Sequence, residues 1–150
     1  MPSAKGQDIR DRTFRFGVRV VRMSNRLPRT AAGFELARQV IRSGTSIGAN
    51  LEEADAGESK ADFVHKAKIA LKESRETRFW LRTIIEAELL CDEETKGLLK
   101  ESDELVRIIY TIIANTQNKW TNRAIANEPI PELDFVHSTK PTRFLVYFTE

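Results

Sequence analysis

The 150-residue sequence contains one cysteine, Cys91, and two histidines, His65 and His137. A single cysteine cannot form an intrachain disulfide, and two distant histidines make no zinc-ligand pattern. No segment approaches the roughly 20 apolar residues of a membrane-spanning helix, and the first residues lack the apolar core of a signal peptide. We therefore expect a soluble, cytoplasmic protein with no metal, no cofactor and no membrane contact.

The net charge is also small: the sequence has 24 Lys and Arg and 22 Asp and Glu, which gives +2. Such a balance does not by itself indicate a nucleic-acid-binding protein. The charges are nevertheless unevenly placed: segments 5–29 and 60–82 are basic, whereas segment 86–104 is acidic. Blocks of this kind predict charged faces that meet partners, or that meet one another within one assembly.

What the sequence has in abundance is helical periodicity, in four segments at about 9–27, 31–57, 60–90 and 93–119. Thr30, Ser59 and Asp92 precede three of them as N-cap residues. The connections are short, so consecutive helices are antiparallel. The sequence predicts an all-α, up-down-up-down four-helix bundle over residues 1–122. Three prolines after residue 128 predict a short non-helical C-terminal tail, residues 123–150, in which 144–148 is a strand or docking segment.

Two features of the first two helices indicate close packing. Phe14, Val18 and Val21 lie off the main apolar stripe of the first segment, so its apolar arc is wide enough for two neighbours. Gly44 and Gly48 stand inside the second segment, where each costs about 1 kcal/mol relative to alanine. The glycines therefore predict the close approach of another backbone.

Arginines repeat along the first segment with spacings of three and four residues, which places them in one sector of a helix. Such a row is suited to contact successive phosphates, and the third segment adds basic residues with Phe79 among them. The predicted nucleic-acid-binding residues are Arg12, Arg15, Arg19, Arg22, Arg26, Lys68, Lys72 and Arg75. The alternative is that these cations pair with the acidic segment 86–104 of the same molecule or the next one.

The second segment carries a line of polar residues beside its apolar stripe: Arg42, Ser43, Ser46, Asn50 and Glu53. No histidine or cysteine joins them, so they assemble no nucleophile and base. We expect a structural hydrogen-bond network here and no catalytic residues, and hence no enzyme.

Five joined motifs carry a resemblance to a known family: RSGTSIGAN at 42–50, LEEA at 51–54, SKADF at 59–63, KAKIALKE at 66–73 and ETRFWL at 76–81. Over about residues 11–118 the sequence resembles the bacterial four helix bundle proteins, related to 23S rRNA-intervening-sequence proteins. The resemblance implies a homopentameric ring. Its relatives include the accessory protein of diversity-generating retroelements, which implies nucleic acid and a reverse transcriptase as possible partners.

Together these observations predict a non-enzymatic, homo-oligomeric accessory protein that binds RNA or DNA through the basic surface of its first helix. The competing hypothesis is a protein–protein scaffold, or a self-assembling bundle with no nucleic-acid partner.

Overall fold

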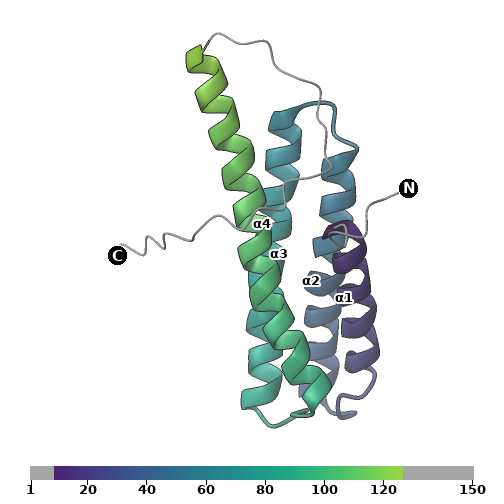
Figure 1. Ribbon diagram of the computed structural model, residues 1–150. Coiled ribbons are helices and arrows are strands. Elements are labelled where there is room, and N and C mark those ends of the chain that lie inside the picture. Colours follow the sequence, from purple (N-terminus) through teal and green to yellow (C-terminus); the bar gives the residue numbers. More distant parts are fainter. Residues whose placement is uncertain (1–8, 127–150) are drawn as a thin grey trace, which may run out of the picture.

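The computed structural model describes residues 9–126, which form four helices in antiparallel order: α1 (Ile9–Ser24), α2 (Ala31–Asp55), α3 (Lys60–Glu86) and α4 (Glu93–Ala126). The chain runs down α1, up α2, down α3 and up α4 (Figure 1). The predicted up-down-up-down bundle is therefore confirmed. Helix α1 covers only the lower part of the bundle, and the far end of α4 projects beyond the other three helices.

The predicted N-caps begin three of the helices. The Thr30 hydroxyl accepts a hydrogen bond from the Gly33 N–H at 3.1 Å, and the Ser59 hydroxyl accepts one from the Asp62 N–H at the same distance. The Asp92 carboxylate accepts from the Thr95 N–H at 2.8 Å. Each bond satisfies a backbone donor that has no partner inside the helix.

Two helix ends differ from the sequence prediction for local reasons. Helix α3 ends at Glu86, because Glu88 adopts a left-handed φ of 56° and the Leu89 N–H returns to the Ile84 carbonyl at 3.1 Å. Helix α4 reaches Ala126 instead of Lys119, since the first helix-breaking residue of this region is Pro129. The remainder of the predicted tail, with its segment 144–148, lies outside the described residues.

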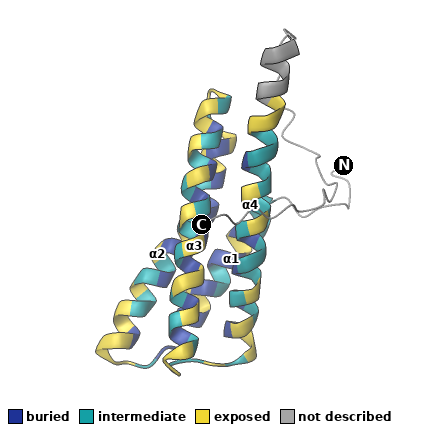
Figure 2. Cartoon of the chain, turned by 90° about the vertical axis from the view of Figure 1, so that its left-hand side faces the viewer, coloured by how far each residue is buried: buried dark blue, intermediate teal, exposed yellow. Residues whose placement is uncertain are grey.

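The core follows the predicted apolar stripes and runs along the axis of the bundle (Figure 2). Phe16 and Val20 of α1 meet Val40 and Ile47 of α2, and these side chains are at most 1% exposed. The α3 and α4 contributions include Phe63, Leu81, Leu98, Leu105 and Ile109. On α4, Ile113 is buried more completely than Ile112, which only packs at the edge of the core.

Helix α1 explains the two glycines of α2. A Cβ on Gly48 would lie 3.4 Å from the Thr13 and Phe14 backbone, and a Cβ on Gly44 would lie 3.0 Å from the Val20 side chain. The predicted close approach is confirmed, and it is made by α1 of the same chain. The small residues of α2 therefore provide no separate support for a contact between subunits.

The described part of the chain covers the off-stripe apolar residues of α1 only in part. Phe14 and Val21 are 66% and 37% exposed, and Val18, between them, is half-buried. Phe34 and Ile41 lie seven residues apart on the neighbouring side of α2, and Phe34 is 64% exposed. We call these residues the apolar α1–α2 patch: Phe14, Val18, Val21, Phe34 and Ile41.

Candidate nucleic-acid interface

The five arginines of the first segment form two rows. Residues seven apart on a helix nearly share one direction, whereas residues three apart differ by about 60°. Arg12, Arg19 and Arg26 therefore face α4, while Arg15 and Arg22 point outward. The regular spacing in the sequence conceals this division, because it does not show where the neighbouring helix lies.

Every arginine of the first row pairs with carboxylates of α4 or of its N-cap. Arg12 Nε lies 2.9 Å from Glu101 Oε1, and Arg12 Nη2 lies 2.6 Å from Glu104 Oε2. Arg19 Nε lies 2.8 Å from Glu94 Oε1, and Arg26 pairs with Asp92. We call these contacts the α1–α4 ion-pair ladder. Within the chain they match the alternative in which the arginines meet the acidic segment 86–104.

Four groups at the ladder, Arg12, Arg19, Asp92 and Glu104, have pKa values shifted toward the charged form. Burial opposes the charge of Arg12, but hydrogen bonds to Glu101 and Glu104 outweigh it and raise the pKa of the guanidinium. The same hydrogen bond lowers the pKa of Glu104. Hydrogen bonds from the Thr95 N–H and hydroxyl, reinforced by Arg26, lower the pKa of Asp92. These arginines are thus held as charged partners of α4.

The outward row is sparse. Arg15 pairs with Asp11 on its own helix at 3.0 Å, with its side chain 66% exposed, and such exposed pairs contribute little. Arg22 is exposed and makes no ion pair within residues 9–126. Of the five predicted arginines, Arg15 and Arg22 are therefore the two that make no ion pair with another helix or its cap within the described residues.

Helix α3 presents the opposite arrangement. Four of its exposed cations follow a 4-3-7 spacing along one outward face, and none of these four makes an ion pair with a carboxylate among the described residues. They form what we call the basic α3 row: Lys68, Lys72, Arg75 and Arg82. Arg82 and the nearby Arg78 were not among the predicted binding residues. Arg82 lies seven residues from Arg75, so helical period alone places both on one flank of α3, whereas the placement of α4 brings Arg78 to the same hollow.

A hollow of about 420 Å³ between α3 and α4 lies at one end of this row, lined by Arg75, Arg78, Phe79, Arg82, Leu99 and Asp103. Arg78 Nη1 crosses to Asp103 Oδ1 at 3.1 Å. Phe79 is 58% exposed and meets Trp80 edge-on, with ring centroids 4.9 Å apart. Three cations and an exposed aromatic ring thus surround one carboxylate.

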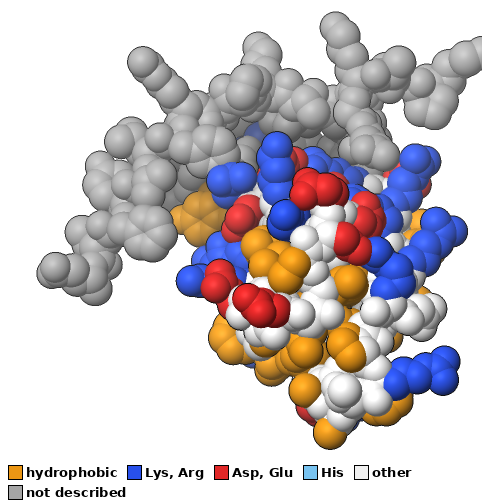
Figure 3. Space-filling view, turned by 90° about the horizontal axis from the view of Figure 1, so that it is seen from below, with side chains coloured by type: hydrophobic (Ala, Val, Ile, Leu, Met, Phe, Trp, Pro, Cys, Tyr) orange, Lys and Arg blue, Asp and Glu red, His pale blue; other side chains and the backbone are white. Residues whose placement is uncertain are grey.

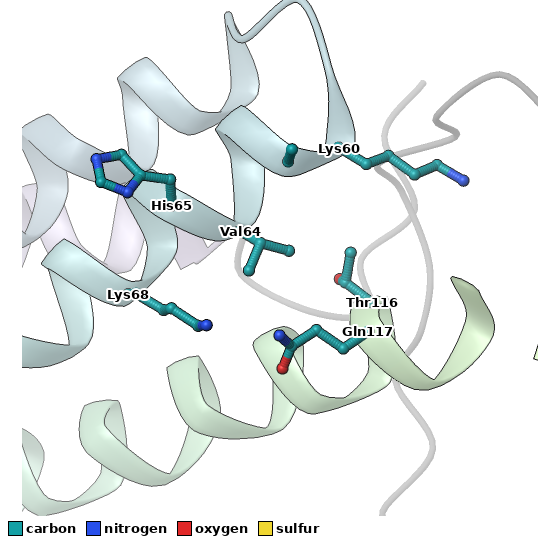
Figure 4. Close-up of a pocket in the computed structure, with 7 residues that line it drawn as sticks. Lys60, Val64, His65, Lys68, Thr116 and Gln117 are labelled. Atoms are coloured by element: carbon teal, nitrogen blue, oxygen red, sulfur yellow. The ribbon is translucent and has the colours of Figure 1, made fainter. Parts of the chain in front are cut away.

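A second hollow, of about 290 Å³, lies toward the other end of the row (Figure 4). Val64 points toward α4, and Lys68 and Gln117 extend toward one another, whereas Lys60 and His65 point away. Thr116 contributes the remaining α4 wall. The groove between α3 and α4 is therefore bordered by cations at both ends.

The end of the molecule that carries the α1–α2 and α3–α4 turns shows both charged and hydrophobic areas. There, acidic and basic side chains adjoin one another over part of the surface, and hydrophobic side chains gather over another part (Figure 3).

Among the described residues, the side chains of the five polar residues of α2 form no hydrogen bonds with one another. The Ser46 hydroxyl donates to the Arg42 carbonyl at 2.7 Å, and the Asn50 amide donates to the Ser46 carbonyl at 2.8 Å. The Ser43 hydroxyl likewise donates to the Gln39 carbonyl. Lys66 of α3 pairs with Glu53. These residues therefore link to the backbone of α2 and to α3.

Arg42 of this group also meets α3, where it pairs with Glu76 and lies 3.8 Å from Glu73. Burial, together with the neighbouring Glu76, raises the pKa of Glu73. Glu76 further accepts a hydrogen bond from Trp80 Nε1 at 3.1 Å. Glu76 thus contacts both Arg42 of α2 and Trp80, the residue whose ring meets Phe79.

In the part of the chain that the structure describes, no three His, Cys, Asp or Glu side chains group in a way that could hold a metal ion. None of the described helices is long and apolar enough to cross a lipid bilayer.

The sequence profile of the 23S rRNA-intervening sequence proteins matches residues 5–111, which include α1, α2, α3 and half of α4. The chain belongs to this family. It is also similar to a crystal structure from Bacteroides thetaiotaomicron, described as a protein of unknown function from the S23 ribosomal protein family. The two share 38% identity and a TM-score of 0.65, over 70% of this chain and 97% of that one. A comparison with curated proteins gives no significant match.

Proposed function

We propose that this 23S rRNA-intervening sequence family member is a non-enzymatic, homo-oligomeric accessory protein that binds nucleic acid through the basic α3 row. The observation that carries the proposal is the row itself: Lys68, Lys72, Arg75 and Arg82 are exposed and have no carboxylate partner among the described residues. This moves the binding surface away from α1, where Arg12, Arg19 and Arg26 are engaged with α4.

Phosphate is the ligand that such a row fits. Arginine and lysine neutralise backbone phosphates without reading sequence, and each neutralised phosphate adds about 0.9 to the salt dependence of log affinity for duplex DNA. The row extends over about 20 Å of helix, because Lys68 and Arg82 are fourteen residues apart and each residue adds about 1.5 Å. A surface of this length contacts several phosphates at once.

Self-association is the second part of the proposal. The apolar α1–α2 patch exposes two phenylalanines and a valine on adjoining helices, and contiguous apolar surface of this kind marks interaction sites. A second copy of the chain is the occupant that we propose, with the five-fold ring implied by the resemblance as the expected assembly. A ring repeats a modest binding surface and raises its avidity.

The experiment compares substitutions of exposed apolar residues on two different surfaces, the apolar α1–α2 patch and the α3–α4 side. Sedimentation velocity should show dissociation of the Phe14→Ser, Val21→Ser variant into monomers with unchanged helical circular dichroism. The matched Phe79→Ser variant should keep the wild-type sedimentation coefficient. A monomeric wild type, or dissociation by Phe79→Ser alone, would overturn the assembly.

The second candidate is a scaffold that binds an acidic protein, a reverse transcriptase included, and no nucleic acid. The same apolar patch favours it, because a different protein can cover exposed phenylalanines as well as a second copy can. Electrophoretic mobility shift with labelled RNA and DNA at 50 and 200 mM salt separates the two. Retention at the lower salt that weakens steeply at the higher supports our proposal, and no retention at either supports the scaffold.

A further inference from the structure

Two exposed aromatic rings lie on the α3–α4 side of the bundle, outside the apolar α1–α2 patch. Phe79 of α3 and Tyr110 of α4 are 58% and 57% exposed. A solvent-exposed aromatic side chain on a surface rich in arginine and lysine has a recognised use, because bases stack on such rings while the cations hold the phosphates. The positions of the two rings relative to the basic α3 row decide whether they can act together.

The contacts between the two helices fix their register. Arg78 bonds Asp103 at one level, and Val64 faces Gln117 across the hollow at another. Because α3 and α4 are antiparallel, Tyr110, midway between Asp103 and Gln117, lies level with Leu71. Asp103, Tyr110 and Gln117 are seven residues apart, so they share one side of α4.

The register therefore places the rings at two levels of the α3–α4 side, separated along the helices by eight residues, or about 12 Å. Lys72 and Arg75 lie between these levels, with Lys68 and Arg82 just beyond them. The distance exceeds the 3.4 Å step between stacked bases, so the two rings would hold bases a few nucleotides apart. Cations and rings thus alternate along the surface.

Phe79 is the better supported of the two rings. Trp80 contacts it edge-on at an interplanar angle of 76°, and Trp80 is itself half-buried and hydrogen-bonded to Glu76. This support restricts the motion of the ring before any ligand arrives, which lowers the entropic cost of stacking. It also places a fluorescent indole directly beside the platform.

We infer that the groove between α3 and α4 binds single-stranded nucleic acid in preference to duplex, with Phe79 and Tyr110 as stacking platforms between the cations of the basic α3 row. The inference rests on the proposed nucleic-acid-binding function and names its substrate class. In a duplex the bases are paired and stacked on one another, so only the phosphates reach this surface. In a single strand both phosphates and base faces are available.

The test uses the full-length chain with Trp120→Phe, so that Trp80 is the remaining tryptophan. Fluorescence anisotropy measures its affinity for labelled 15-nucleotide oligo(dT) and oligo(U) and for a 15-base-pair duplex at one salt concentration. The single strands should bind about tenfold more tightly than the duplex. They should also quench Trp80 fluorescence, since a base then stacks beside the indole.

Phe79→Leu and Tyr110→Leu keep apolar bulk but remove the aromatic face. Each should weaken single-strand binding about tenfold and leave duplex binding unchanged. Phe34→Leu is the control, an exposed phenylalanine of the apolar α1–α2 patch whose apolar bulk is kept; once sedimentation shows the wild-type assembly, it should change neither affinity.

The outcomes separate this inference from the proposed function. If Lys72→Glu with Arg75→Glu removes all binding while the aromatic variants bind normally, stacking is overturned and phosphate binding stands. Equal affinity of the wild type for single strand and duplex also overturns the inference. If the wild type binds neither, the proposed function itself fails.

Discussion

The α1–α4 ion-pair ladder and the basic α3 row each place several cations along one side of a helix, yet these cations meet different surroundings. Arg12 and Arg19 face Glu94, Glu101 and Glu104 across a helix contact, and their side chains are 24% and 33% exposed. Lys72 and Arg75 face solvent beside a groove whose facing carboxylate, Asp103, is already bonded to Arg78.

The difference shows that the sequence of an amphipathic helix does not decide whether its cations form ion pairs within the fold. That depends on whether the flank of the neighbouring helix that faces them is acidic. On α4 the acidic flank faces α1, so the arginines there stabilise the fold. The flank toward α3 carries Leu99, Thr116 and Gln117 and one carboxylate, Asp103, which pairs with Arg78. The cations of the basic α3 row therefore remain available to an external anion.

The largest expected effect is the loss of nucleic-acid binding when the basic α3 row is reversed in charge. Lys72→Glu with Arg75→Glu replaces two unpaired cations by anions and should weaken nucleic-acid binding on the order of 100-fold at 100 mM salt. The free energy of unfolding should stay within about 0.5 kcal/mol of wild type, because neither residue has a partner to lose. Anisotropy titration and urea unfolding measure the two quantities. A comparable loss of stability would mean that the row is structural.

The next effect breaks the ladder. Arg12→Gln removes charged hydrogen bonds to Glu104 and to Glu101, which keeps its ion pair with Arg19, and should lower the free energy of unfolding by about 1 kcal/mol. Arg15→Gln is the matched control on the same helix, with an expected change below about 0.5 kcal/mol. Nucleic-acid affinity should change less than twofold in both. Equal stabilities for the two variants would contradict the ladder.

Lowering the pH should remove the stabilisation that the carboxylates of the ladder provide. Asp92 and Glu104 have folded-state pKa values below their ordinary values, so they stabilise the protein above the ordinary carboxyl pKa of about 4. That stabilisation is lost as the pH falls through the lower folded-state values. Asp92→Asn with Glu104→Gln retains an N-cap residue but removes both titrations. Thermal unfolding between pH 6 and pH 2.5 should therefore show a shallower decline for the variant, and parallel curves would refute the linkage.

The smallest expected effect comes from a substitution outside both the ion-pair ladder and the basic α3 row. Glu88 holds a left-handed φ of 56° at the end of α3, where glycine carries no Cβ penalty. Glu88→Gly should raise the free energy of unfolding by about 0.5–1 kcal/mol, offset in part by the freer unfolded chain. Because Glu88 lies outside the ladder and the row, affinity should not change. Differential scanning calorimetry beside anisotropy checks that stability and binding vary separately.

The features predicted from the sequence are those encoded locally. Thr30, Ser59 and Asp92 cap helices with their own neighbours, and the apolar stripe from Phe16 to Met23 needs only helical period to be recognised. The cations required more. Whether Arg12 is paired depends on the antiparallel register that brings Glu101 beside it, 89 residues along the chain. Tyr110 was missed for the same reason, because its position relative to Leu71 follows from packing alone.

The salt dependence of binding tests the central claim most directly, because its slope counts the phosphates that a protein neutralises. Arg75→Gln and Arg19→Gln remove the same charge from the two regions. The account predicts that Arg75→Gln lowers the slope of log affinity against log salt by about one, while Arg19→Gln leaves the wild-type slope unchanged. The reverse result, a lower slope for Arg19→Gln and none for Arg75→Gln, would contradict it.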